Sequence, residues 1–193
     1  MYRPPAFAVE DEAWCFDFIH RYSFGLFQLG GLSTPMAFVA DEERRVLFGH
    51  VARANPHAKL LDGGGEGVAF FMGPHGYVSP SSYQEPAVPT WNYQAVEIAG
   101  QVQPIDGDAL TNWLAKLVAQ EEAAIGGAWT LAALPQGHVE KLHRAIMGFE
   151  LSIDRVEGKA KLSQNKSVND RNSVAEAFER RGLSDLAAAI KDD

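Results

Sequence analysis

The chain has 193 residues, of which 46% are hydrophobic and 22% are charged, and this composition fits one globular domain and excludes a disordered chain. The 25 acidic and 17 basic residues leave a net charge of −8, which disfavours a protein that wraps broadly around nucleic acid. The single cysteine, Cys15, excludes an intrachain disulfide, and because we find neither a membrane-spanning apolar run nor a signal-peptide pattern, we expect a cytoplasmic protein without a membrane segment.

The first half of the chain alternates short apolar runs with turn residues. Trp14 and Phe18 favour a short helix over residues 11–21. Apolar runs bounded by glycine, proline and aspartate then predict strands at 24–29, 36–40, 45–51 and 67–72. Between the last two strands, Asn55 and Pro56 have the pattern of a helix start.

The second half of the chain predicts longer elements. Apolar and polar residues alternate over 96–103 and again over 149–154, which predicts two strands. Apolar residues spaced three and four apart over 110–118 predict an amphipathic helix. Strands that do not form a βαβ series favour a mainly β fold, a closed antiparallel barrel with peripheral helices.

Two further helices are expected from capping patterns. Apolar residues at helical spacing over 139–147 predict a helix with Gly148 as its C-terminal cap. Near the C-terminus, Ser173 and Glu176 have the spacing of a capping box, which predicts another helix start.

The segment 46–56 joins a predicted strand to a predicted helix start. The N-terminus of a helix presents free N–H groups and the positive end of the helix dipole, so it suits a phosphate group. His50 and Arg53 come just before it and add hydrogen bonds and charge. The alternative is purely structural, with Asn55 capping the helix and Arg53 in solvent.

Two segments, 73–83 and 88–93, are rich in aromatic residues and proline. Hydroxyl and amide groups lie among the rings, and this mixture suits a flat heteroaromatic ligand. Trp91 and Tyr93 share one strand face, so they can form one stacking platform. Packing in the core or in an interface is the alternative role.

A polar segment follows the last predicted strand. Lys161, Ser163 and Asn165 occupy alternate positions, so a strand would direct a cation, a hydroxyl and an amide to one side. That arrangement suits an anion or a polar ring. A solvated polar edge strand is the alternative.

The sequence holds no GxSxG, Walker or HExxH motif, and its glycine cluster at 63–67 follows a predicted helix instead of opening one. These observations count against hydrolase, kinase and Rossmann-type functions. We also find no internal nucleophile or evident acid–base pair.

Seven short motifs occur in a fixed order: MYRPPAF at 1–7, HVARANP at 50–56, GPHGYVSP at 73–80, VPTWNY at 88–93, GFE at 148–150, EGKAKLSQN at 157–165 and DR at 170–171. With these motifs the chain resembles the PaiB-like family of FMN-binding negative transcriptional regulators over residues 1–175. The resemblance implies a split β-barrel of the pyridoxamine-phosphate-oxidase and flavin-reductase type. It also implies a homodimer with FMN at the subunit interface.

In this resemblance, residues 1–172 form the FMN-binding domain and residues 173–193 a C-terminal helical tail. We expect the phosphate at the turn that follows His50 and the ring near Trp91 and Lys161. By their physical type, the expected cofactor contacts are His50, Val51, Ala52, Arg53, Asn55, Ser79, Ser81, Trp91, Asn92, Tyr93, Lys161, Ser163, Gln164 and Asn165.

The chain departs from the family pattern at three places. Ser82 stands where family members usually carry a tryptophan, and Glu97 where they often carry a histidine. The segment 30–40 lacks the Ser-His-Leu-Pro pattern of the family. Each change lies near the expected pocket and bears on the affinity for FMN.

Three functions remain open. The resemblance implies a regulator, but the chain has no recognisable helix-turn-helix and is acidic, so we expect regulation without direct DNA binding. The alternatives are an FMN-dependent oxidoreductase that uses NAD(P)H and a non-catalytic module that binds flavin as a small-molecule ligand. The local basic patch at 155–171 is the segment that direct DNA binding would need.

Overall fold

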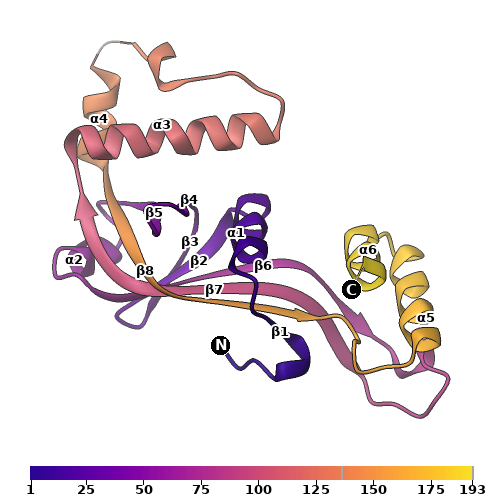
Figure 1. Cartoon of the computed structure of the whole chain (residues 1–193). Helices are drawn as coiled ribbons and strands as arrows, with labels where there is room; N and C mark the ends of the chain where they lie inside the picture. The colour runs from indigo at the N-terminus through magenta and orange to yellow at the C-terminus, as the bar shows by residue number, and fades with distance from the viewer. Residues whose placement is uncertain (136, 193) are drawn as a thin grey trace. The chain divides into compact units, whose positions relative to one another are not determined.

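The computed structural model describes residues 1–135 and 137–192. Figure 1 labels most of the elements, which are, in chain order, η1 (Pro5–Phe7), β1 (Ala8–Val9), α1 (Glu12–Arg21), β2 (Phe24–Leu29), β3 (Leu32–Ala37), β4 (Val39–Asp41), β5 (Val46–Ala52), α2 (His57–Leu61), β6 (Gly65–Val78), η2 (Pro80–Ser82), β7 (Thr90–Ile105), α3 (Gly107–Ala124), η3 (Leu131–Ala133), α4 (His138–Ala145), β8 (Ile146–Lys161), α5 (Val168–Glu179) and α6 (Ser184–Asp192).

The strands form a sheet in the order β3-β2-β6-β7-β8-β5-β4, and the short strand β1 pairs with β8. The pairs β2–β3, β2–β6, β4–β5 and β5–β8 are antiparallel. The chain divides into two compact units, each described separately below. Unit 1 comprises residues 1–18, 71–97 and 157–193, and unit 2 comprises residues 19–70 and 98–156.

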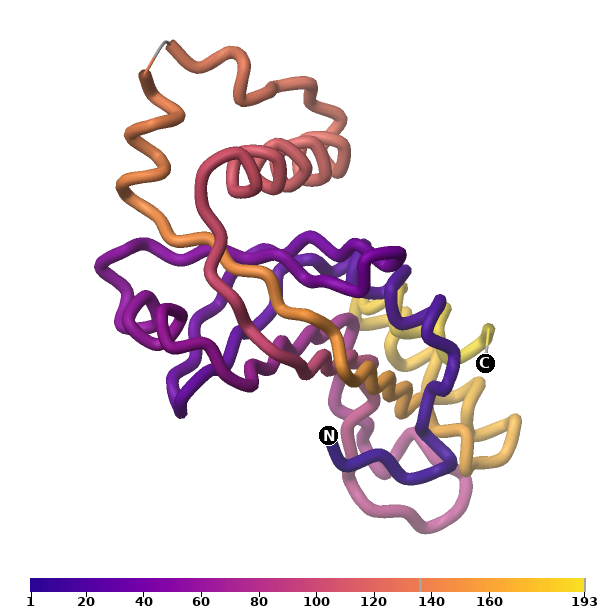
Figure 2. Tube along the Cα trace, turned by 60° about the vertical axis from the view of Figure 1, so that its left-hand side comes forward, coloured from indigo at the N-terminus to yellow at the C-terminus, as the bar shows by residue number. Residues whose placement is uncertain are grey.

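Unit 2 has a core between α3 and the strands β4 and β5. One apolar face of α3 packs on these strands through Leu110, Trp113, Leu114 and Leu117, against Val39, Val46 and Phe48. The rings of Phe48 and Trp113 stack with centroids 5.4 Å apart. In Figure 2 the Cα trace runs from β7 into α3 and returns from α4 into β8. The helix predicted at 110–118 is therefore confirmed and extends from residue 107 to residue 124.

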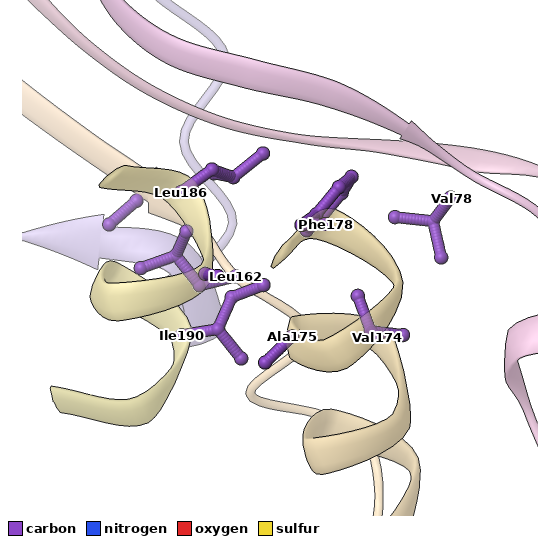
Figure 3. Close-up of a cluster of buried hydrophobic side chains, with 9 residues drawn as sticks. Val78, Leu162, Val174, Ala175, Phe178, Leu186 and Ile190 are labelled. Carbon is purple, nitrogen blue, oxygen red and sulfur yellow. The ribbon is translucent and has the colours of Figure 1, made fainter. Parts of the chain in front are cut away.

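Unit 1 has its own apolar core, formed where α5 and α6 pack together with residues of β6 and of the end of β8. Figure 3 shows this cluster of buried side chains, which comprises Val78, Ala160, Leu162, Val174, Ala175, Phe178, Leu186, Ala187 and Ile190. Burial of these apolar groups is the main force that holds the two helices in unit 1.

The helix predicted over 139–147 ends earlier than expected. Helix α4 stops at Ala145, and β8 begins at Ile146, which pairs with Ala52 of β5. Gly148 is a strand residue, and a Cβ placed on it would lie 2.6 Å from Leu110 Cδ1. Glycine at this position therefore lets α3 pack closely on β8, and the prediction that it caps a helix is wrong.

The start of α5 was also misplaced by the sequence pattern. The helix begins at Val168, and the Oγ of Ser167 accepts a hydrogen bond from the N–H of Asp170 at 3.1 Å. The predicted capping residue, Ser173, lies inside this helix. The cap lies upstream, at Ser167, because this residue has the extended backbone of an N-cap residue.

The strand predicted at 36–40 is two strands. β3 ends at Ala37 and β4 begins at Val39, because the N–H of the fully buried Phe38 donates to the carbonyl oxygen of Ser23 instead of to a neighbouring strand. The short helix predicted over 11–21 is confirmed as α1. None of the helices in the described part of the chain has the length and apolar character needed to cross a membrane.

Candidate functional site

In unit 2, the residues predicted to hold a phosphate lie at the end of β5 and in the turn that follows it. Val51 is buried, so it can face a ligand only through its backbone, whereas Ala52 is exposed. Burial lowers the pKa of His50, whose Nδ1 has no hydrogen-bond partner among the described residues. The guanidinium of Arg53 is exposed and donates to the carbonyl oxygen of His143 at 3.4 Å.

A polar network fixes this turn. Asn55 Oδ1 accepts a hydrogen bond from the N–H of His57 at 2.9 Å, and Asn55 Nδ2 donates to Thr34 Oγ1 at 3.2 Å. Thr34 Oγ1 also lies 2.8 Å from Nδ1 of His57, whose side chain is fully buried. Asn55 therefore has the capping role that the sequence indicated, and its amide also ties the turn to β3.

Helix α2 is only five residues long, from His57 to Leu61. A single helical turn has a small dipole, so the helix start contributes little to a phosphate site on its own. The expectation of a phosphate here now depends on the two polar side chains, His50 and Arg53.

In unit 1, aromatic side chains gather around Trp91 on β7. The indole is 52% exposed, and its ring centroid lies 6.2 Å from those of His75 and Tyr77 on β6. Along β7, Trp91 is exposed, Asn92 buried and Tyr93 half-buried. This alternation places Trp91 and Tyr93 on one strand face, as the sequence predicted.

Two predicted contacts, Asn92 and Ser163, bind each other. Asn92 Nδ2 donates to Ser163 Oγ at 3.0 Å, and both side chains are buried. The ammonium of Lys161 donates to the hydroxyl of Thr90, so a second bond joins the same two segments. These residues join the start of β7 to the end of β8, directly beside Trp91.

The alternation predicted from Lys161 to Asn165 does not occur. β8 ends at Lys161, and Ser163 adopts a left-handed backbone with φ of 67°. The N–H of Lys166 donates to the carbonyl oxygen of Ser163 and closes a turn. A turn is favoured because Gln164 satisfies the backbone locally, accepting from the N–H of Leu162 and donating to the carbonyl oxygen of Ala160. Asn165 is exposed in this turn.

The remaining two predicted contacts, Ser79 and Ser81, line a pocket of about 740 Å³ in unit 1. Their hydroxyl groups lie 2.8 Å apart, and the Oγ of Ser79 also accepts from the N–H of Ser81. The pocket lies between the loop after β6 and helix α5, which contributes Phe178 and Arg181. Ser82 also lines it, at the position where the family usually has a tryptophan.

Lys159 belongs to the site but was left out of the expected contacts. Its side chain is only 6% exposed, and its Nζ lies 5.1 Å from the ring centroid of Tyr93 and 5.4 Å from that of Tyr2. The available sequence signal was a lysine between two small residues, Gly158 and Ala160, in a predicted strand environment.

The second departure from the family pattern, Glu97, is held by an ion pair. Its Oε1 accepts a hydrogen bond from the Met1 ammonium at 2.8 Å, and Glu157 Oε2 accepts from the same group at 2.5 Å. This carboxylate is therefore part of a local charge cluster in unit 1. The third departure from the family pattern is the segment 30–40. Within it, Thr34 forms hydrogen bonds that hold the turn before α2.

The chemical groups in unit 1 fit a flavin. An isoalloxazine ring needs a flat apolar surface and hydrogen bonds or charge at its polar edge. Trp91 and Tyr77 supply exposed ring surface, and Lys161 and the buried Lys159 supply cations on the neighbouring strand. In unit 2, Arg53 and His50 are groups that can meet a phosphate.

Comparison with known proteins also indicates flavin binding. Residues 1–155 match the family model described as "Putative FMN-binding domain". The chain belongs to this family. FMN is accordingly the cofactor of this family, in agreement with the resemblance seen in the motifs of the chain.

Relatives of this chain occur in bacteria and fungi. It is 29% identical over 185 residues to the "Protease synthase and sporulation protein PAI 2" of Bacillus subtilis, covering 93% of this chain and 89% of the relative. An uncharacterised protein of Emericella nidulans is 35% identical over 184 residues, which cover 78% of this chain and 73% of that protein.

Among solved structures, the FAD and heme binding protein from Mycobacterium smegmatis matches the fold of this chain with a TM-score of 0.61. The match covers 85% of this chain and 78% of that chain at 17% sequence identity. This similarity concerns the fold alone. It confirms the expected mainly β fold of the split-barrel type with a few helices.

Proposed function

We propose that the protein is a cytoplasmic, homodimeric FMN-binding regulator of the PaiB type. In this proposal helices α5 and α6 form a C-terminal helical tail on the flavin-binding domain, and FMN lies at the interface of two subunits. The observation that carries the proposal is the exposed aromatic surface around Trp91, with Tyr77 40% exposed beside it. Exposed apolar surface of this kind is typical of a ligand site or a subunit interface.

The residues of this chain then have separate roles. Trp91 and Tyr93 provide a surface on which the ring stacks, and the Asn92–Ser163 pair keeps that part of β7 in place. Arg53 and the neutral His50 meet the phosphate. When bound, FMN supplies a ring system that takes up and returns electrons, while the protein supplies position and electrostatic environment.

Regulation in this proposal does not require contact with DNA. The net charge of −8 opposes binding to phosphate backbones. We expect no retardation of promoter fragments in a mobility-shift assay at moderate salt. Specific retardation that decreases after charge-reversal of the exposed Arg155 in the 155–171 basic patch would show that regulation is direct.

A flavin-dependent oxidoreductase is the second candidate. The exposed face of Trp91 favours it, because an open ring surface leaves room for the flat ring of a second reactant. Anaerobic mixing of the FMN-loaded protein with NADH or NADPH in a stopped-flow instrument separates the two functions. Rapid loss of flavin colour with either donor supports the enzyme, and persistence of the colour with both donors supports the regulator.

A further inference from the structure

Lys159 carries a buried positive charge in unit 1. Its side chain is 6% exposed, and its backbone pairs with that of Ala8 where β1 covers β8. The Nζ donates one hydrogen bond, to the carbonyl oxygen of Tyr2 at 2.9 Å. An ammonium group has three N–H donors, so this single bond satisfies only part of its capacity.

The charge has no carboxylate partner in the part of the chain that the structure describes. The two carboxylates on the neighbouring stretches of β7 and β8, those of Glu97 and Glu157, bind the Met1 ammonium at 2.8 and 2.5 Å. Lys159 instead contacts the faces of two tyrosine rings. Buried lysines are normally paired with an acidic group, because an uncompensated charge is costly to remove from water.

One of these rings connects Lys159 to the aromatic platform. The Nζ lies 5.1 Å from the ring centroid of Tyr93, which shares a strand face with Trp91. The cation is thus on the side of the sheet where a flat ligand would stack. The side chains expected at the phosphate, Arg53 and His50, belong to unit 2.

We propose that Lys159 binds the negatively polarised edge of the flavin ring and is the main protein charge that tunes it, an inference that rests on the FMN site proposed above. Lys159 is not a phosphate ligand in this proposal. Reduction increases the negative charge on a flavin near neutral pH, so a neighbouring ammonium favours the reduced form over the oxidised one. The counter-charge that Lys159 lacks in the protein alone is then provided by the cofactor.

The test compares Lys159→Met, which keeps the length of the side chain and removes the charge, with Lys159→Arg, which keeps the charge. Lys166→Met is the matched control, because its ammonium also lies over a tyrosine ring, 4.9 Å from the centroid of Tyr83. Tyr2→Ala removes one of the covering rings without changing the charge. For each protein we measure the dissociation constants of FMN and riboflavin by fluorescence quenching, the midpoint potential by titration against a reference dye, and the melting temperature without flavin.

We expect Lys159→Met to weaken FMN and riboflavin binding by the same factor, about tenfold. The reduced flavin should lose about tenfold more affinity than the oxidised one, which lowers the midpoint potential of the two-electron couple by about 30 mV. Lys159→Arg should restore most of the potential, whereas Lys166→Met and Tyr2→Ala should leave it at the wild-type value. The flavin-free Lys159→Met protein should melt no lower than wild type, because a buried charge without an acidic partner does not stabilise the fold.

Three results would overturn the inference. Loss of affinity for FMN but not for riboflavin would place Lys159 at the phosphate. Unchanged affinities and potential, with a lower melting temperature, would give it a purely structural role in holding Tyr2. Failure of the wild-type protein to bind either flavin would instead overturn the proposed FMN site itself, and this inference with it.

Discussion

At the scale of single residues, the thiol of Cys15 is the clearest example of a reactive group made inert by its surroundings. The side chain is 2% exposed, and burial raises the pKa of the thiol to about 11. The thiolate is the reactive species, so we predict almost no reaction with a disulfide reagent at about pH 8 in the folded protein. The same thiol should react fully in guanidinium chloride. Fast stoichiometric modification of the native protein would contradict this environment.

His57 gives the fold a dependence on pH. Burial lowers the pKa of His57, whose side chain is fully buried in the folded protein. The unfolded chain therefore takes up a proton first as the pH falls, which favours unfolding. We predict that the free energy of unfolding decreases from about pH 7.5 to about pH 5.5, and that His57→Gln lowers stability at the upper pH but shows a weaker decrease. Urea unfolding at several pH values measures both, and parallel curves for the two proteins would exclude the role of His57.

At the scale of elements, the start of α5 offers a direct test of which serine caps the helix. Ser167 Oγ accepts from the N–H of Asp170, whereas Ser173 lies within the helix. We predict that Ser167→Ala lowers the free energy of unfolding by about 1 kcal/mol. Ser173→Ala should change it by less than about 0.5 kcal/mol, because it removes no cap. Equal losses in chemical denaturation would show that the cap does not lie at Ser167.

The elements differ in how far local sequence determines them. The helix at 107–124 follows from its own apolar spacing, and the second half of β7 follows from its alternation of apolar and polar residues. The end of α4 does not follow from local spacing. Glycine is required at position 148 because Leu110 of α3 approaches it closely, and local spacing cannot reveal this contact. The sequence pattern predicts Ser173 as the cap of α5, although Ser167 and Ser173 are each followed three residues later by an acidic residue. Only the extended backbone at Ser167 distinguishes the two serines.

The features of the candidate site also differ in how far the sequence predicts them. The shared face of Trp91 and Tyr93 follows from strand periodicity, whereas the exposure of Trp91 does not, and the motifs predict the family that the comparison shows. The turn after Lys161 could not be foreseen, because it depends on the left-handed backbone of Ser163 and on the side-chain bonds of Gln164. The buried charge of Lys159 depends on Tyr2, a residue far away in sequence.

At the scale of the whole molecule, the exposed aromatic surface predicts a homodimer. We expect size-exclusion chromatography with light scattering to give twice the chain mass of 21.1 kDa. Trp91→Glu should shift the protein toward the monomer, because it places a charge within the apolar surface. Trp129→Glu is the matched control, since this tryptophan of unit 2 is also exposed, at 43%, and should leave the dimer intact. A monomeric wild-type protein, or equal dissociation by both variants, would contradict the dimer.

The most direct test of the account is a titration of the purified flavin-free protein with FMN, followed by flavin fluorescence and visible absorbance. We predict quenching that saturates at one FMN per chain, with weaker binding of riboflavin because the phosphate contributes charged hydrogen bonds. Trp91→Ala should weaken the binding of both. A wild-type protein that leaves the fluorescence of added FMN unquenched and stays colourless would contradict the central claim that this chain binds FMN.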